Sequence, residues 1–184
     1  MTLGLQFPEV RLFPYTSAWA DAFDHERERI QRILKNNIIG IEHVGSTAIP
    51  GIRAKPIIDI AVAVHDLGLV DAFAADMASI GYDDAGDGGV PGQRIFGRGP
   101  RIRTHLVHFV VDGSEAWRNY LAFREALLGD RELAKAYDSL KHSLAAEFPA
   151  DRRSYTSAKS EFIERVLSRA TAQPGAGICA RTFP

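Results

Sequence analysis

The segment IEHVGSTAIPGIRAKPIIDI at residues 41–60 sets the architecture of this chain, because it holds the end of one strand-like run, the start of a second and the connection between them. The first run, at 38–44, is rich in β-branched residues and ends at Gly45. The second run, IIDIAVAV at 57–64, is apolar on both faces, which predicts a central strand covered by helices. The connection between them holds two glycines and two prolines, which favour turns.

Helices and one further strand are expected outside this segment. The run RIRTHLVHFVV at 101–111 predicts another strand, and residues 82–100, with six glycines, predict a hairpin with a mobile loop. Apolar residues recur at helical spacing in five segments: from about Ser17 to Leu34, at about 69–80, after the candidate N-cap Ser114, near 131–147 and near 152–170.

This order of elements is not a regular alternation of strands and helices. It predicts an α+β fold, with a small mixed sheet flanked by helices and a helical C-terminal half. We expect one domain over residues 1–170. The segment 171–184, rich in glycine and proline and without periodicity, is expected to be a flexible tail.

The composition excludes several classes of protein. The 184 residues carry 22 basic and 23 acidic side chains, a net charge of −1, so bulk attraction to nucleic acid or to an anionic membrane is not expected. One cysteine excludes an internal disulfide and a cysteine-built zinc site. The sequence has no signal peptide and no apolar run of roughly 20 residues, so we expect a cytoplasmic protein without a membrane span.

Asp59 is the first candidate site residue, because it interrupts an apolar strand. Strand alternation places it on the face of the small Ala61 and Ala63, which leave room beside it. A buried carboxylate requires a metal, a cation or hydrogen-bond donors. A structural ion pair is the alternative.

Gly45 and Ser46 end the first strand at a turn, where a hydroxyl and free amides can hold a phosphate. Thr47 and Lys55 lie in the same connection and join the candidate substrate-binding residues. An ordinary turn is the alternative interpretation.

Two histidines on the last predicted strand are further candidates. Their spacing of three puts His105 and His108 on opposite faces of a regular strand, so they do not converge on one metal ion. We therefore expect one in the site and the other in the core or on the surface. His108 is the candidate for catalysis, and His105 is kept as a candidate substrate contact.

Basic residues supply candidate anion contacts. The stretch 94–103 contains four arginines and no acid, and Arg94 is its strongest candidate, with solvated arginines as the alternative. On the last predicted helix Lys159 follows Tyr155 by four residues, on the inward stripe. Lys159 either extends to solvent or reaches a phosphate or Asp59.

Together these residues carry a resemblance to a known family. The segment 41–60 closely resembles the signature of the GrpB-like family, in the nucleotidyltransferase superfamily with its polymerase-β-like fold. The resemblance extends over most of the chain, through GY at 81–82, RIF at 94–96, SEAW at 114–117, LAFREAL at 121–127, YDSLKHSLA at 137–145 and YTSAKSEFI at 155–163.

The resemblance implies that Gly45 and Ser46 match the phosphate-binding turn of the superfamily, and that Asp59 matches the first acid of its metal-binding pair. Magnesium, held by Asp59, is the implied cofactor. A single ion held by Asp59 and a histidine, or no ion with Arg94 and Lys159 neutralising the phosphate, is also chemically admissible. The chain departs from the pattern at Ala61, where the second acid would stand, and in the segment from His105 to His108, where a third would stand.

The leading hypothesis is a nucleotide-binding protein that transfers a nucleotidyl group from a nucleoside triphosphate to an unidentified small acceptor. Its catalytic residues would be Asp59, His108 and Lys159. Its substrate-binding residues would be Gly45, Ser46, Thr47, Lys55, Arg94, His105 and Tyr155. The alternative is a non-catalytic nucleotide-binding or accessory module that has lost the metal-binding acids, since domains of this family occur attached to dephospho-CoA kinases. Recognition of a polynucleotide is disfavoured by the short basic patch and the net charge.

Overall fold

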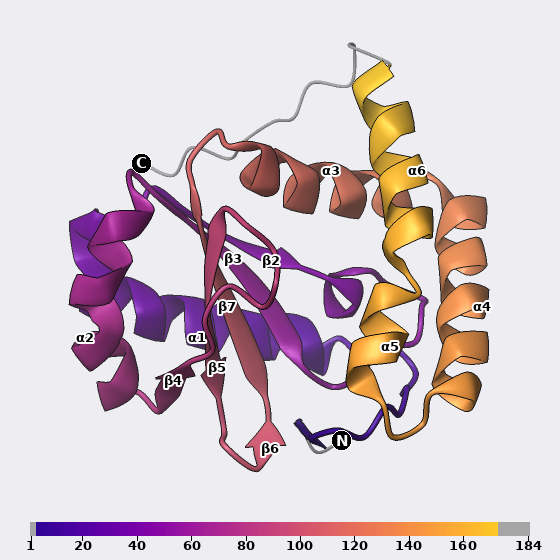
Figure 1. Ribbon diagram of the computed structural model, residues 1–184, viewed down its shortest axis with the longest axis horizontal. Helices are drawn as coiled ribbons and strands as arrows, with labels where there is room; N and C mark the ends of the chain where they lie inside the picture. Colours follow the sequence, from indigo (N-terminus) through magenta and orange to yellow (C-terminus); the bar gives the residue numbers. More distant parts are fainter. Residues whose placement is uncertain (1–2, 173–184) are drawn as a thin grey trace.

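A five-stranded mixed sheet forms the centre of the computed structural model, which describes residues 3–172 (Figure 1). The strand order is β2-β3-β7-β5-β4, with β3 and β7 parallel and the other pairs antiparallel. A separate two-stranded sheet pairs β1 with β6. The strands are β1 (Leu5–Gln6), β2 (Gly40–Val44), β3 (Ile58–Val64), β4 (Tyr82–Asp84), β5 (Gln93–Arg98), β6 (Ile102–Arg103) and β7 (His105–Val111).

Helices flank the sheet, and the second half of the chain is mostly helical (Figure 1). The α-helices are α1 (Ala18–Leu34), α2 (Ala74–Ser79), α3 (Glu115–Gly129), α4 (Arg131–Glu147), α5 (Arg152–Ser157) and α6 (Ser160–Ala172). Short 3-10 helices are η1 (Lys35–Asn37), η2 (Ser46–Ala48) and η3 (Leu67–Phe73). The α+β class, the small mixed sheet and the helical C-terminal half are thereby confirmed.

Three predicted elements are interrupted in the structure. The helix expected at 69–80 is η3 followed by a short α2, and the Asp66 side chain accepts a hydrogen bond from the Gly68 amide where η3 begins. The strand expected at 101–111 is divided at Thr104, because β6 pairs with β1 while β7 enters the main sheet. The helix expected at 152–170 is divided between α5 and α6.

Strand alternation sorts the side chains of β3 onto two different faces. Ile58, Ile60, Val62 and Val64 pack into the large core formed with α1, α2 and η3. Ala61 and Ala63 face the other way and pack with Trp117 and Leu121 of α3. Ser114 caps this helix as expected, since its hydroxyl accepts a hydrogen bond from the Trp117 amide at 3.2 Å. The small alanines let α3 lie close to the sheet.

Asp59 lies at the start of β3, on the α3 face but before the two alanines that α3 covers. Its partner on β2 is Val44, the last residue before the Gly45 turn. On β7 its partner is Leu106. The register therefore brings the carboxylate of Asp59 next to the turn that begins at Gly45.

None of the described helices combines the length and the apolar character needed to cross a bilayer. Helix α6 continues to Ala172, so the first two residues of the tail expected at 171–184 are helical. Residues 173–184, which include Cys179, lie outside the described part of the chain.

Replacement of Gly45 by alanine should destabilise the fold more than the same change at Gly51. Both glycines have positive φ, +69° and +85°, which costs alanine about 1–2 kcal/mol. At Gly45 the added Cβ would also collide with the Asp59 side chain, whereas at Gly51 it would meet nothing within 4 Å. We expect Gly45→Ala to lower the free energy of unfolding by about 1–3 kcal/mol more than Gly51→Ala, as measured by urea denaturation. Equal losses would contradict the close packing of Gly45 on Asp59.

Candidate functional site

A cavity of ≈ 330 Å³ opens on the α3 face of the sheet, at the Asp59 end of β3. Its walls come from β3, β5, β7, η2, α3 and α5 and from the loop before β5. Seven of the residues singled out from the sequence line it: Ser46, Thr47, Lys55, Asp59, His108, Tyr155 and Lys159. Gly45 lies directly behind the Asp59 side chain. Segments more than 90 residues apart in the chain therefore meet at one cavity.

Asp59 and His108 face each other across the β3–β7 pair. The His108 Nε2 atom lies 3.6 Å from the Asp59 Oδ1 atom. The Asp59 side chain is 31% exposed, so it is less buried than its strand position suggests, because it opens onto the cavity. The carboxylate therefore keeps contact with water or a ligand.

A hydrogen-bond network orients the His108 ring. The Tyr120 hydroxyl donates to Gln93 Oε1 at 2.7 Å and also lies 3.0 Å from His108 Nδ1. Because the tyrosine proton is committed to Gln93, Nδ1 of His108 is the donor to the tyrosine oxygen. Nε2 of a neutral His108 is then an acceptor that faces the Asp59 carboxylate, another acceptor. A ligand hydroxyl placed beside the two atoms could donate its proton to either of them.

Three cationic side chains line the same cavity: Lys55, Arg152 and Lys159. The Lys55 and Lys159 ammonium groups lie 5.0 and 4.5 Å from the centre of the Tyr155 ring. Such contacts hold both cations over the aromatic face. Arg152 donates to the backbone oxygens of Gln6 and Glu9 at 3.1 and 3.0 Å, which fixes it at the cavity wall.

Burial and mutual repulsion make these cations easier to deprotonate. Burial, together with nearby Lys159 and Arg152, lowers the pKa of Lys55 to about 7. Burial lowers the pKa of Lys159 to about 8, although the charge of Asp59 acts in the opposite direction. A bound anion would favour the protonated form of both lysines.

Thr47 helps to hold the turn at Gly45 and Ser46 in place. It is buried, and its hydroxyl lies 2.9 Å from His43 Nε2. The His43 ring stacks on Phe23 with ring centres 4.8 Å apart. Burial lowers the pKa of His43 to about 4, so this histidine is neutral near pH 7 and fixes the turn without adding charge.

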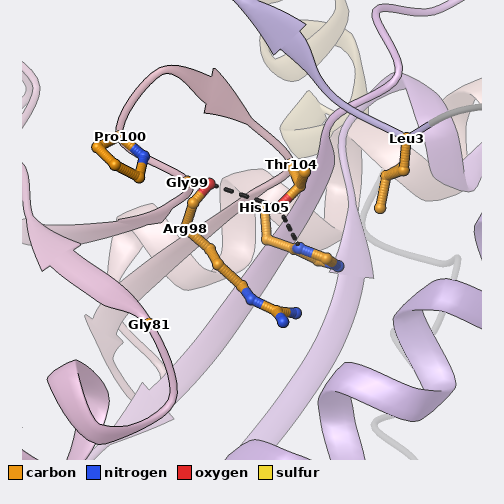
Figure 2. Close-up of a pocket in the computed structure, with 7 residues that line it drawn as sticks. All are labelled: Leu3, Gly81, Arg98, Gly99, Pro100, Thr104 and His105. Carbon is orange, nitrogen blue, oxygen red and sulfur yellow. Dashed lines mark hydrogen bonds between the residues drawn. The ribbon is translucent and has the colours of Figure 1, made fainter.

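Two of the predicted substrate contacts lie away from the cavity. Arg94 pairs with Asp84 and lies 3.6 Å from Asp71, because it projects toward β4 and η3. His105 lies on the opposite face of the sheet, where it lines a second, more open pocket (Figure 2). Alternation along β7 separates it from His108. We therefore leave both residues out of the site.

The cavity also contains polar residues that the sequence analysis did not select: Gln93, Tyr120, Arg152 and Thr156. Arg152 and Thr156 could have been found, since they share the helical stripe of Tyr155 and Lys159 at spacings of three and four. Gln93 lies beside the glycine-rich loop, and no local pattern distinguishes it. Tyr120 sits between core residues of α3 and gives no separate signal.

The donors present do not fit a magnesium ion held by the protein. Asp59 is the only carboxylate among the described residues that line the cavity, and three cations surround it. Within residues 3–172, no group of three or more histidine, cysteine, aspartate or glutamate side chains is arranged to hold a metal ion. Magnesium prefers several oxygen ligands, which this cavity lacks.

Comparisons with known proteins place the chain in a family. The profile described as "GrpB protein" matches residues 9–169. The chain is 38% identical over 156 residues to the UPF0157 protein YqkA of Bacillus subtilis (strain 168), a match that covers 85% of this chain and 46% of YqkA. It therefore spans about half the length of that relative.

Two further matches extend this result. The crystal structure of the conserved protein GrpB from Enterococcus faecalis aligns with a TM-score of 0.82 at 35% identity, covering 88% of this chain and 98% of that one. A dephospho-CoA kinase of Mycolicibacterium paratuberculosis (strain ATCC BAA-968 / K-10) is 25% identical over 186 residues, which cover 88% of this chain and 46% of the kinase. With its profile match over most of the described residues and a crystal structure of the same fold, the chain belongs to the GrpB protein family.

Proposed function

We propose that the Asp59 cavity binds the phosphate groups of a nucleotide or another phosphorylated small molecule, and that it does so without a metal ion held by the protein. The observation that carries this proposal is the charge balance, since Lys55, Arg152 and Lys159 surround one carboxylate. With both lysines protonated, the cavity carries an excess of two positive charges, which favours a polyanion. Hydroxyls of Ser46 and Thr156 at the cavity wall supply uncharged contacts to phosphate oxygens.

The size of the cavity limits how much of the ligand it encloses. Its ≈ 330 Å³ is near the lower end of the range for ligand sites, roughly 300–1,000 Å³. The apolar Ile57, Ile95 and Leu106 supply one part of the wall. This fits a phosphate chain with a small attached group, and a larger base or acceptor would extend past Val90 at the exposed loop.

Nucleotidyl transfer is the second candidate function, and the Asp59–His108 pair favours it. Oδ1 and Nε2 are 3.6 Å apart, so an acceptor hydroxyl placed beside both atoms would donate its proton to one of them. The hydroxyl oxygen would then bond to the α-phosphorus, and the bond to the leaving pyrophosphate would break. Lys55, Arg152 and Lys159 would stabilise the charge on the leaving group. A binding or accessory module without turnover is the alternative, consistent with the match to part of a dephospho-CoA kinase.

Binding of a triphosphate should be independent of magnesium and should strengthen when Asp59 loses its charge. Calorimetric titrations with each of the four nucleoside triphosphates and with inorganic triphosphate would measure this. We expect dissociation constants with EDTA and with magnesium to agree within about twofold. Asp59→Asn should tighten binding several-fold, because it removes roughly 1 kcal/mol of repulsion from the phosphates.

Glu42→Gln is the matched control for this charge change, because Glu42 pairs with Arg124 and does not line the cavity. It should leave binding unchanged. Loss of binding in Asp59→Asn, or a strict need for magnesium, would instead show a metal-held phosphate. Failure of every triphosphate to bind would refute the proposed function.

Anion binding should weaken as the pH rises. Because the pKa values of Lys55 and Lys159 are lowered to about 7 and about 8, both ammonium groups lose protons over the range from about pH 6.5 to about pH 9. The bound phosphates favour the protonated lysines, so binding at about pH 8 should take up protons. Calorimetry in buffers of different ionisation enthalpy would count them. Lys159→Arg keeps its charge at these pH values and should take up fewer protons. Equal uptake by both proteins would contradict this assignment.

Turnover would be tested by release of pyrophosphate from a nucleoside triphosphate in the presence of candidate acceptors that carry a hydroxyl. We expect release to fall at least a hundredfold in His108→Gln and in Asp59→Asn, because either change removes one proton acceptor of the pair. His142→Gln, a change outside the cavity lining, should leave it unchanged. Triphosphate binding without release for any acceptor would favour the binding module.

A further inference from the structure

A second pocket lies on the opposite face of the sheet, and it is independent of the cavity assigned above. It has a volume of ≈ 420 Å³ and is lined by residues from the β5–β7 connection, by Gly81 and by Leu3 (Figure 2). Arg98 of β5 and His105 of β7 are direct cross-strand partners, so their side chains extend from the same face. Both line the pocket.

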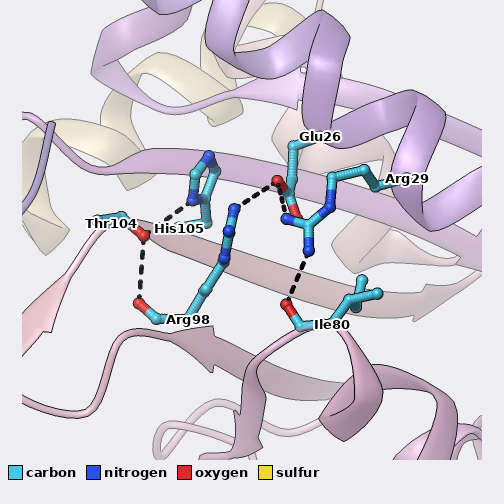
Figure 3. Close-up of polar contacts among 6 residues, drawn as sticks. All are labelled: Glu26, Arg29, Ile80, Arg98, Thr104 and His105. Atoms are coloured by element: carbon cyan, nitrogen blue, oxygen red, sulfur yellow. Dashed lines mark hydrogen bonds and ion pairs between the residues drawn. The ribbon is translucent and has the colours of Figure 1, made fainter.

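A cluster of charged side chains holds the Arg98 guanidinium in place. Glu26 of α1 is 2% exposed and accepts hydrogen bonds from Arg29, at 3.0 and 2.8 Å, and from Arg98 Nη1 at 2.7 Å (Figure 3). Arg29 also donates to the backbone oxygen of Ile80 at 3.1 Å. Two guanidinium groups thus share one carboxylate, which leaves the cluster with one positive charge. Such a cluster favours a monoanion.

The Nε–Nη2 edge of Arg98 is available to that anion. Within residues 3–172, only Nη1 of this guanidinium has a hydrogen-bond acceptor. Gly81 lines the pocket beside this edge, since a Cβ at this position would lie 3.9 Å from the Nε atom. The edge presents two parallel N–H groups, which match the two oxygens of a carboxylate.

The Nε2 atom of His105 is a hydrogen-bond acceptor that receives no donor from the described residues. The Thr104 hydroxyl donates to the Arg98 backbone oxygen at 3.4 Å, and its oxygen lies 3.0 Å from His105 Nδ1 (Figure 3). Nδ1 is therefore the donor to Thr104, and Nε2 carries the lone pair. His105 is 4% exposed, and its Nε2 has no hydrogen-bond partner among the described residues. Burial also lowers the pKa of His105 to about 4, which keeps the ring neutral near pH 7.

We propose that this pocket is a second binding site, which takes a small carboxylic acid that carries a hydroxyl group. The carboxylate binds the free edge of Arg98, and the hydroxyl donates to Nε2 of His105. A hydroxyl suits this position better than an ammonium, because the cluster is already positive. Leu3 lies on the His105 side of the pocket, where it contacts an apolar substituent of the acid (Figure 2).

Lactate and propionate separate the two contacts, because propionate lacks the hydroxyl. Each would be titrated into the full chain, with ionic strength kept constant by chloride, while backbone amides are followed by NMR. We expect lactate to shift the Gly99, Thr104 and His105 signals saturably, with a dissociation constant on the order of 1–10 mM. Propionate should bind at least about fivefold more weakly, because the Nε2 acceptor stays unpaired.

Arg98→Lys is the test variant, because a lysine keeps the charge opposite Glu26 but lacks the two-donor edge. It should weaken lactate binding at least about tenfold. Arg103→Lys is the matched control, since Arg103 pairs with Asp83 at 2.9 and 3.1 Å and does not line the pocket. It should leave binding unchanged.

The comparison of lactate with propionate on the unaltered chain needs no variant, so the test holds even where Arg98→Lys does not fold. Equal affinity for the two acids would overturn the role of His105. The absence of saturable shifts at about 50 mM lactate, or shifts confined to Ser46 and His108, would overturn the second site. Neither result would bear on triphosphate binding in the first cavity.

Discussion

The parallel pairing of β3 with β7 is the constraint on which both pockets depend. Because this pairing sets Ala61 opposite His108 and Ile58 opposite His105, the two histidines project from opposite faces at a fixed register. A shift of one residue in either strand would exchange the faces of all its side chains. The alternation of large and small residues in β3 opposes such a shift, since Ile58, Ile60 and Val62 fill the large core whereas Ala61 and Ala63 pack under α3. The same burial that stabilises the sheet thus places the polar side chains.

The two histidines of β7 differ because their surroundings differ. His108 faces a cavity and is held by Tyr120 and Gln93, so its outer nitrogen meets Asp59. His105 is enclosed near a cluster of one carboxylate and two guanidinium groups, and burial keeps it neutral. Strand β7 therefore presents His108 beside an acidic side chain on one face of the sheet. On the other face it presents His105, whose Nε2 atom has no partner among the described residues. Neither role can be assigned from sequence spacing without knowing which face each helix covers.

Much of the fold could be predicted from the sequence, because apolar periodicity reports burial directly. The run 57–64, apolar on both faces, identified a central strand, and the spacing after Ser114 identified α3. The interruptions could not be predicted, because they depend on distant partners. Thr104 divides the strand expected at 101–111 only because β6 pairs with Leu5 and Gln6, about 100 residues earlier in the chain.

In the candidate site, the residues that could be identified from the sequence are polar or charged residues within an otherwise apolar strand or helical stripe. Asp59 in an apolar strand and Lys159 on an inward helical stripe are such residues, and both line the cavity. Arg94 was selected on the same grounds, but it pairs with Asp84 on the adjacent strand and therefore lies outside the cavity. Gln93 and Tyr120 were not found, because their importance comes from a tertiary contact with His108. Composition alone could not distinguish a paired arginine from a free one.

The charge distribution of the cavity follows from how the chain is divided between sheet and helices. The carboxylate comes from β3, whereas Arg152 and Lys159 come from α5 and the break that follows it. Lys159 lies in the break between α5 and α6, and its ammonium group is 4.5 Å from the centre of the Tyr155 ring. Because Ala61 occupies the position two residues after Asp59, the sheet adds no second carboxylate to balance these cations. Cations supplied by the helices therefore outnumber the acid supplied by the sheet, and this imbalance is the physical basis of the proposal that the cavity binds an anion without a metal ion.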